Sequence, residues 1–190
     1  FFDPACRTAN CLRITYKELR LLEIKILQKI IELSKNNEIH FTQIQLTQFY
    51  GIELDDFAHE MAIFLLWLVE QQMNKIDDEK LEGFGQSTPI LPLKQAGQIV
   101  CDNAARIDWQ TVCPINLADE VYVIGNPPYL GSRNQDEAQK ADMELVFQKE
   151  YKSLDYVSIW FYKGAKYIEA NNAQLAFVST NSICQGLLVA

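Results

Sequence analysis

The sequence predicts an α/β fold, in which a mostly parallel sheet carries helices on both of its faces. Two observations lead to this prediction. Short apolar runs typical of strands alternate along the chain with longer patterns typical of amphipathic helices. Polar residues also follow the predicted strands directly, at the edge where open α/β sheets bind their ligands.

The first strand and the first long helix are predicted at the start of the chain. Phe1 and Phe2 are expected to end a strand. An amphipathic helix is predicted for residues 12–33, because apolar residues recur there at steps of three, four or seven. The polar residues 35–38 are expected to end this helix.

A second strand and helix are predicted next, followed by an irregular segment. Residues 47–53 predict a strand, and Asp55 or Asp56 is expected to cap the helix after it. The apolar side of that helix is expected to carry Phe57, Met61, Phe64, Leu65 and Leu68. Residues 74–97 are polar at first and then rich in glycine and proline, so we expect a long surface excursion there.

The rest of the chain continues the alternation of strands and helices. Further strands are predicted at residues 99–101, 121–124 and 173–179. Helices are predicted at residues 142–149 and 155–169, with a polar loop at 131–139. The second of these helices is expected to turn Val157, Phe161, Ala165 and Ile168 inward. Lys163 and Lys166 are expected to be solvated.

Length and composition are those of one globular domain. The chain has 190 residues, of which 48% are hydrophobic and 22% charged. No apolar run approaches the roughly 20 residues that span a bilayer, so we expect no membrane contact. The chain begins without methionine and ends in the middle of a predicted domain. We therefore expect residues 1–190 to be a single domain, incomplete at both ends, of a longer protein.

Cysteine and charge content bear on location and partners. Five cysteines without a Cys-x-x-Cys pair, together with two histidines, do not favour a zinc site. Buried thiols in a reducing cytoplasm account for them most simply. The net charge of −8 argues against this chain holding nucleic acid by itself, since phosphate binding needs a basic surface.

Asn-Pro-Pro-Tyr at residues 126–129 is the most informative feature for chemistry. It follows the apolar run 121–125, and its prolines prevent the strand from continuing. The amide of Asn126 can accept a hydrogen bond from an amino group, and Tyr129 can stack on a planar ring. This combination suggests methylation of an exocyclic or amide nitrogen. An ordinary strand-ending turn is the alternative for the tetrapeptide taken alone.

Three other predicted strand ends offer groups that a nucleoside-like cofactor could use. Residues 3–10 join a strand to a helix, so backbone N–H groups there can meet a polar ligand. Glu53 ends the second strand, where a carboxylate can bind both ribose hydroxyls. Asn103 follows the third strand and can hydrogen-bond an adenine edge. The simpler alternatives are a turn cap at Asp3, a solvated Glu53 and a turn residue at Asn103.

Taken together, these motifs resemble a known family. Asp-Pro-Ala-Cys from residue 3, Gly-Ile-Glu-Leu from residue 51, Asp-Asn-Ala-Ala from residue 102 and Gly-Asn-Pro-Pro-Tyr from residue 125 come in the family's order. The chain resembles the DNA methyltransferases that use S-adenosylmethionine to make N6-methyladenine. It is most similar to the methylase part of fused type II restriction–modification enzymes. The resemblance implies a Rossmann-like class I methyltransferase fold, with the target-recognition domain and any nuclease domain elsewhere.

The resemblance also implies a role for individual residues. Asp3, Ala5 and Asn10 would border the methionine part of S-adenosylmethionine. Glu53 would bind its ribose, with Leu54 beside the adenine. Asn103 would face the cofactor's adenine amino group, with Ala104 against the ring. No metal is implied, because the methyl donor is a sulfonium.

The Asn-Pro-Pro-Tyr motif would hold the substrate base. Asn126 and the carbonyl of Pro127 would accept hydrogen bonds from the target N6 amino group. Pro128 completes the motif, and Tyr129, which follows it, would stack on the adenine. The implied partner is double-stranded DNA with a flipped adenine, bound mainly by regions outside this chain. Because such regions are absent, we expect the chain to be inactive alone. The sequence gives no indication of the oligomeric state.

The first motif departs from the family at three positions. Arg7 and Ala9 stand where the family usually has glycine, and Cys11 stands where it has an aromatic residue. Glycine permits positive φ and close approach to a ligand. These substitutions either weaken cofactor binding or are tolerated, with Arg7 in solvent or attracted to the cofactor carboxylate.

Two other functions remain open at this point. One is a non-catalytic structural domain in which Arg7 and Ala9 mark a degenerated cofactor pocket. The other is methylation of a protein glutamine or of RNA guanine, since those enzymes share the tetrapeptide. Their first motif is usually glycine-rich, so residues 3–6 favour DNA.

Overall fold

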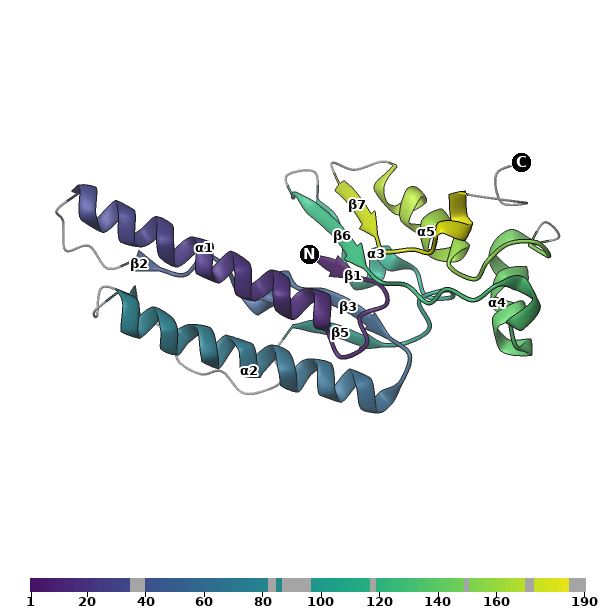
Figure 1. The fold of residues 1–190 in the computed structure, drawn as a ribbon, viewed down its shortest axis with the longest axis horizontal. Helices are drawn as coiled ribbons and strands as arrows, with labels where there is room; N and C mark the ends of the chain where they lie inside the picture. The colour runs from purple at the N-terminus through teal and green to yellow at the C-terminus, as the bar shows by residue number, and fades with distance from the viewer. Residues whose placement is uncertain are drawn as a thin grey trace.

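A parallel sheet of five strands forms the centre of the described structure (Figure 1). Its spatial order is β5-β3-β1-β6-β7, with β1 at Phe2–Asp3, β3 at Tyr50–Glu53, β5 at Gln98–Cys101, β6 at Val121–Gly125 and β7 at Ala173–Phe177. The computed structural model describes residues 1–34, 40–81, 85–86, 97–116, 119–148, 151–169 and 173–184. The predicted α/β class and parallel sheet are confirmed.

The short strand β1 holds the middle of this sheet. Phe2 pairs with Tyr50 of β3 on one side and with Val123 of β6 on the other. The chain builds outward from β1 to β3 and β5, and then crosses to β6 and β7. The strand order therefore reverses between β1 and β6. Open α/β sheets bind ligands at such a reversal, outside the carboxyl ends of the strands.

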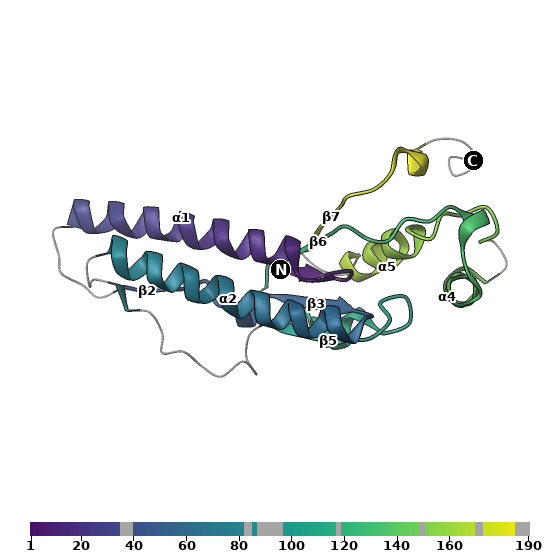
Figure 2. The same cartoon turned by 60° about the horizontal axis from the view of Figure 1, so that its bottom comes forward.

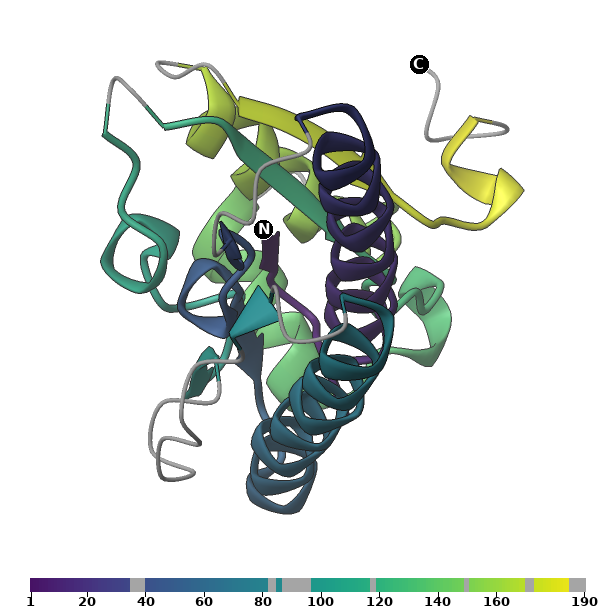
Figure 3. The same cartoon turned by 90° about the vertical axis from the view of Figure 1, so that its left-hand side faces the viewer.

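Helices cover both faces of the sheet. The long helices α1 (Asn10–Ser34) and α2 (Asp56–Lys80) lie together on one face, and α3 (Trp109–Val112) and α5 (Ser158–Ile168) lie on the other (Figure 3). Each face has its own core. One core contains Leu12, Tyr16, Phe49, Leu66 and Met73, and the other contains Phe2, Trp109, Val123, Ile159 and Trp160. Helix α4 (Glu137–Phe147) lies beyond the carboxyl edge of the sheet (Figure 1).

Helices α1 and α2 run side by side and extend past the sheet (Figures 1 and 2). A small pair of parallel strands, β2 (His40–Phe41) and β4 (Gly85–Gln86), lies near their far ends. Arg20 of α1 is fully buried between the helices and donates to Asp77 at 3.0 Å and to Asn74 at 3.4 Å. Within the described residues, no helix is long and apolar enough to cross a bilayer.

Several element bounds differ from those predicted. Helix α2 continues to Lys80, so the start of the expected excursion at 74–97 is helical. Asn74 and Asp77 are polar, but they are buried against Arg20. Because Arg20 lies 54 or more residues away in the chain, the residues around Asn74 could not indicate this burial. The expected helix end at 35–38 and most of the remaining excursion lie outside the described residues.

The predicted inner faces of two helices were also partly wrong. Phe57 and Phe64 are exposed, while α2 buries Ala62, Leu66, Val69 and Met73. On α5 the buried residues are Ile159, Trp160, Gly164 and Tyr167, so the helix is turned relative to the expectation. The N-cap of α2 is Asp55, whose carboxylate accepts from the N–H of Ala58 at 2.8 Å.

Three further elements have different bounds. The expected strand at 47–53 starts only at Tyr50, because Leu46–Gln48 form a 3-10 turn. Helix α4 begins at Glu137, five residues before the predicted start, since Asp136 and Gln139 form a reciprocal capping box. Strand β7 ends at Phe177 rather than at residue 179.

The buried Arg20–Asp77 pair gives a first prediction about stability. Asp77→Ala is expected to lower the free energy of unfolding by about 3 kcal/mol, because it leaves a buried guanidinium without its nearest carboxylate. Glu32→Ala removes the exposed partner of Lys29 and is expected to change stability by less than about 0.5 kcal/mol. Urea denaturation of both variants measures the difference, and equal losses would contradict a special role for the buried pair.

Candidate cofactor and substrate site

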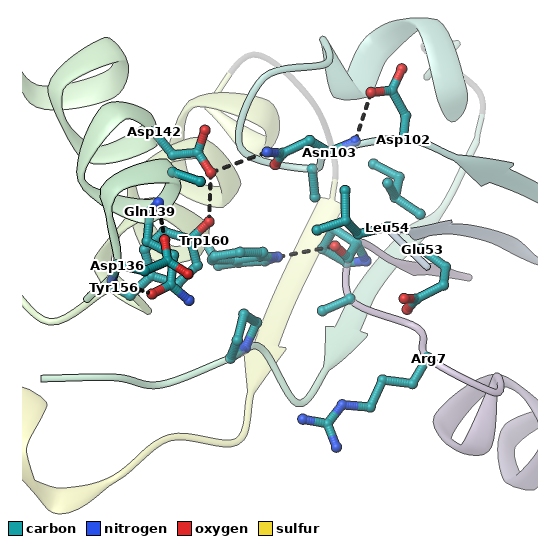
Figure 4. Close-up of a pocket in the computed structure, with 16 residues that line it drawn as sticks. Arg7, Glu53, Leu54, Asp102, Asn103, Asp136, Gln139, Asp142, Tyr156 and Trp160 are labelled. Atoms are coloured by element: carbon teal, nitrogen blue, oxygen red, sulfur yellow. Dashed lines mark hydrogen bonds between the residues drawn. The ribbon is translucent and has the colours of Figure 1, made fainter. Parts of the chain in front are cut away.

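A cavity of about 330 Å³ opens at the carboxyl edge of the sheet, where the strand order reverses. The loops after β1, β3, β5 and β6 line it, together with residues of α4 and α5 (Figure 4). Much of its wall is apolar, from Ala5, Ile52, Leu54, Ala104 and Pro128. Both the volume and the mixture of apolar walls with a few polar groups are typical of small-molecule sites.

The loop between β1 and α1 has a strained backbone at two positions. Arg7 has φ of 49° and Ala9 has φ of 57°, both in the left-handed region that favours glycine. Each costs roughly 1 kcal/mol relative to glycine. The loop is held against β3, because Cys6 donates its N–H to the carbonyl of Ile52 at 3.0 Å. The chain thus adopts a backbone suited to glycine at the two positions where the family usually has glycine.

Asp3 lies beneath this loop rather than in the cavity wall. Its carboxyl is 1% exposed and accepts a hydrogen bond from the N–H of Ala5 at 3.0 Å. Gly125 leaves the space it needs, since a Cβ there would lie 2.6 Å from Oδ1 of Asp3. Burial, and to a smaller extent the charge of Glu53, raise the pKa of Asp3 to about 7. Asp3 therefore fixes the start of the loop through Ala5 and packs against the end of β6 at Gly125.

Glu53 and Leu54 form the cavity wall at the end of β3. The carboxylate of Glu53 accepts the N–H of Asp55 through Oε1 at 2.9 Å, which fixes its direction at the strand end. Leu54 is 68% exposed although it is apolar. A flat apolar ligand resting on Leu54 would remove this surface from water.

Asn103 and Asp102 form the wall at the end of β5. The amide of Asn103 donates to Asp142 at 3.1 Å and accepts the N–H of Ala105 at 2.9 Å. Both ends of this amide are thus used within the protein, and one N–H remains for a ligand. The exposed carboxylate of Asp102 also lines the cavity and accepts the N–H of Asn103 at 2.6 Å.

Lys163 fixes the loop that continues from Asn103. Its ammonium donates to the carbonyls of Ala104 at 2.7 Å, Ala105 at 3.1 Å and Ile107 at 2.7 Å. Trp109 donates its indole N–H to the same carbonyl of Ala104 at 2.9 Å. Burial lowers the pKa of Lys163 to about 8. The prediction that Lys163 is solvated was therefore wrong, because the loop carbonyls face α5 and need a donor.

Asp142 connects the same loop to helix α4. It accepts from Arg106 Nε at 2.6 Å. It also accepts from Asn103 and, at 2.8 Å, from the Tyr156 hydroxyl (Figure 4). Burial by itself would raise the pKa of Asp142, but the three hydrogen bonds hold it below its usual range. The sequence predicted only a helix start here. Its partners lie 14 to 39 residues away, so no local pattern could have indicated them.

The Asn-Pro-Pro-Tyr segment directly follows β6, and one of its residues reaches the cavity wall. Pro127 is buried, Pro128 lines the cavity, and Asn126 and Tyr129 are exposed, the tyrosine by 47%. The segment is fixed at both ends. Val178 donates to the carbonyl of Gly125 at 2.9 Å, and Leu130 donates its N–H to Asp155 at 2.8 Å. A rigid, partly exposed amide and ring are therefore presented beside the cavity.

Comparison with known proteins identifies the family. The family model described as "MmeI, DNA-methyltransferase domain" matches residues 1–190. The chain belongs to this family. It is 51% identical over 188 residues to DNA methyltransferase A of Bacillus subtilis (strain 168), a match that covers 98% of this chain and 21% of that protein.

A solved structure supports the same assignment. The chain is similar to the type IIL restriction–modification enzyme MmeI, solved in complex with DNA, with a TM-score of 0.88 and 41% identity. The match covers 100% of this chain and 25% of that one. The resemblance to the methylase part of restriction–modification enzymes and the methyltransferase fold are confirmed. The chain spans about a quarter or less of the length of these relatives.

The predicted site residues of this methyltransferase domain fall into three groups. The cavity is lined by Ala5, Glu53, Leu54, Asn103, Ala104 and Pro128. Asp3, Asn126, Pro127 and Tyr129 are not lining residues, but they neighbour the lining residues Pro4 and Pro128 in the chain. Asn10 begins α1, is exposed, and accepts from Arg13 at 3.2 Å outside the cavity wall. Trp160 of α5 also lines the cavity, is buried and donates its indole N–H to the carbonyl of Pro4 at 3.0 Å.

Asp3 gives a prediction about pH. Its folded-state pKa of about 7 lies above the ordinary value of 3.8, so the folded state keeps a proton that the unfolded state releases. We compare the free energy of unfolding of wild type with that of Asp3→Asn. The difference in favour of wild type is therefore greatest below about pH 4, and it falls by at most about 4 kcal/mol as the pH rises to about 7. Denaturation of both proteins at pH 5 and pH 8 measures this. A difference that does not change with pH would show that Asp3 is ionised in the folded protein.

Proposed function

We propose that this domain transfers a methyl group from S-adenosylmethionine to the N6 amino group of adenine in DNA, as part of a restriction–modification enzyme. The main observation that supports it is that residues 126–129 follow the carboxyl end of β6 and that Pro128 among them lines a nucleoside-sized cavity. Membership of the MmeI methyltransferase family and the similarity to an enzyme solved with DNA support the proposal.

The cavity fits a nucleoside cofactor. Glu53 offers a carboxylate for the two ribose hydroxyls, and Leu54 and Ala104 offer apolar surfaces for the adenine ring. Asp102 and the free N–H of Asn103 lie where the edge of that ring would meet β5. Several carboxylates in the wall suit the positive charge of a sulfonium. When bound, the sulfonium supplies an electrophilic methyl group.

Asn126 and Tyr129 would act on the substrate base. The adenine amino nitrogen is a poor nucleophile, because its lone pair is delocalised into the ring. Two acceptors, the Asn126 amide oxygen and the Pro127 carbonyl, would bind its two hydrogens and stabilise positive charge as the new bond forms. Tyr129 would stack on the flipped base and offset part of the few kcal/mol that unstacking costs. Its partial exposure leaves a face for this contact.

DNA binding is proposed to depend mainly on other parts of the protein. The chain carries a net charge of −8, which does not favour phosphate contacts. Its relatives are at least about four times longer, so they have room for a separate target-recognition region. The cytoplasmic location and the inactivity of this chain alone stay predictions. Methylation of protein glutamine or of RNA, and a purely structural role, are the competing outcomes of the test.

The proposal predicts the effect of changing Asn126. In the full-length protein, Asn126→Ala is expected to reduce the rate of DNA methylation by about 100-fold or more, since it removes a transition-state acceptor. Affinity for S-adenosylmethionine is expected to stay within a few-fold, because Asn126 does not line the cavity. Methyl transfer to plasmid DNA, followed by nucleoside mass spectrometry, measures both the rate and the base modified.

Tyr129 supplies the matched control for this experiment. Tyr129→Phe keeps the ring and is expected to retain most activity, whereas Tyr129→Ala removes stacking worth about 1–3 kcal/mol. N6-methyladenine as the product supports the proposal. Methylcytosine, or methylation of RNA or protein with no DNA product, would refute the substrate assignment. Wild-type protein that binds S-adenosylmethionine but methylates nothing would favour the structural role.

A further inference from the structure

Arg7 stands out among the residues that line the cavity. It is exposed, it lies in the loop after β1, and its backbone has the left-handed conformation that an arginine seldom adopts. Within the described residues, no hydrogen bond or ion pair is recorded for its guanidinium. Figure 4 shows the side chain extending from the loop, below Glu53 in this view. A costly conformation thus places an unpaired cation at the site.

The charges of the cavity wall make this cation distinctive. Among the described lining residues, the acidic side chains are Glu53, Asp102, Asp136 and Asp142, and Arg7 is the basic one. Asp142 is paired with Arg106 outside the wall. S-adenosylmethionine carries a sulfonium, an ammonium and one carboxylate. The wall carboxylates suit the two cationic groups, but the ligand carboxylate would be repelled everywhere except beside Arg7.

The sheet order decides which end of the ligand would meet Arg7. Glu53 and Ala104 lie at the ends of β3 and β5, so the nucleoside would occupy that side of the cavity. The methyl group must point toward residues 126–129 at the end of β6. Strand β1 lies between β3 and β6, and Arg7 belongs to the loop that follows it. The amino-acid end of the ligand would therefore lie against this loop.

We propose that Arg7 binds the carboxylate of the amino-acid end of S-adenosylmethionine through its guanidinium. The planar fork of arginine matches a carboxylate with two parallel hydrogen bonds. This inference rests on the proposed function and adds a cofactor-binding residue to it. Arg7 then replaces, with a charged contact, the close backbone approach that glycine gives at this position.

The test compares Arg7→Gly with wild type in the full-length protein, by calorimetric titration with two ligands. One is S-adenosylmethionine, and the other is its decarboxylated analogue, which lacks the group that Arg7 is proposed to bind. Arg7→Gly is expected to weaken S-adenosylmethionine binding by about 10- to 100-fold. Binding of the analogue is expected to stay unchanged or to tighten, because the variant removes a like charge.

Ala9→Gly is the matched control. It relieves the same kind of backbone strain at a φ of 57° and leaves the guanidinium in place, so it is expected to leave both affinities unchanged. Arg7→Gly also relieves strain, so the melting temperature without ligand is not expected to fall. Loss of affinity without loss of stability separates a ligand contact from a role in folding.

Four outcomes would overturn the inference. Unchanged or tighter binding of S-adenosylmethionine to Arg7→Gly, with unchanged DNA binding, would show that Arg7 faces solvent. Equal weakening of both ligands would show that Arg7 acts through the loop backbone. Weaker DNA binding with unchanged cofactor binding would assign Arg7 to a phosphate. Failure of wild-type protein to bind either ligand would refute the proposed function as well, and that result is distinct from the other three.

Discussion

The parallel pairing of β1 with both β3 and β6 is the constraint on which the site depends. This two-residue strand forms the point where the strand order reverses. Its position brings the loop after β1, Glu53 and residues 126–129 to one edge, although they are far apart in the sequence. The buried carboxyl of Asp3 packs closely against Gly125 at the end of β6. A Cβ at Gly125 would lie 2.6 Å from Oδ1 of Asp3, so a larger residue there would force Asp3 or the strand end to shift.

Polar contacts from the other face hold the loops in place. Lys163 binds three carbonyls of the loop after β5, and Asp142 binds Asn103 and Arg106 of the same loop. Loops that must approach a ligand closely carry backbone groups that need partners when buried. These buried donors and acceptors replace water there. Loops and helices α4 and α5 thus form the cavity wall together, and the helices also hold the loops in place.

The sequence indicated the strands and the polar residues at their ends well, because both signals are local. Short apolar runs mark the strands, and Glu53 and Asn126 follow two of them directly. It failed where a partner lies far along the chain. In the sequence, Asp77 was expected in a polar surface segment, but it is buried beside Arg20 of α1. Lys163 was expected to be solvated, but it binds loop carbonyls that are distant in the sequence. The buried face of α2 was predicted wrongly, because Phe57 and Phe64 are apolar and were expected to be buried, whereas both are exposed.

The central claim is that the cavity at the carboxyl edge binds S-adenosylmethionine through the end of β3. Calorimetric titration of the full-length protein with this cofactor, beside a Glu53→Ala variant, tests it most directly. We expect saturable binding by wild type and at least about tenfold weaker binding by the variant, since the ribose loses a charged acceptor. Absence of binding, or equal affinity in both proteins, would show that Glu53 does not hold the cofactor in this cavity.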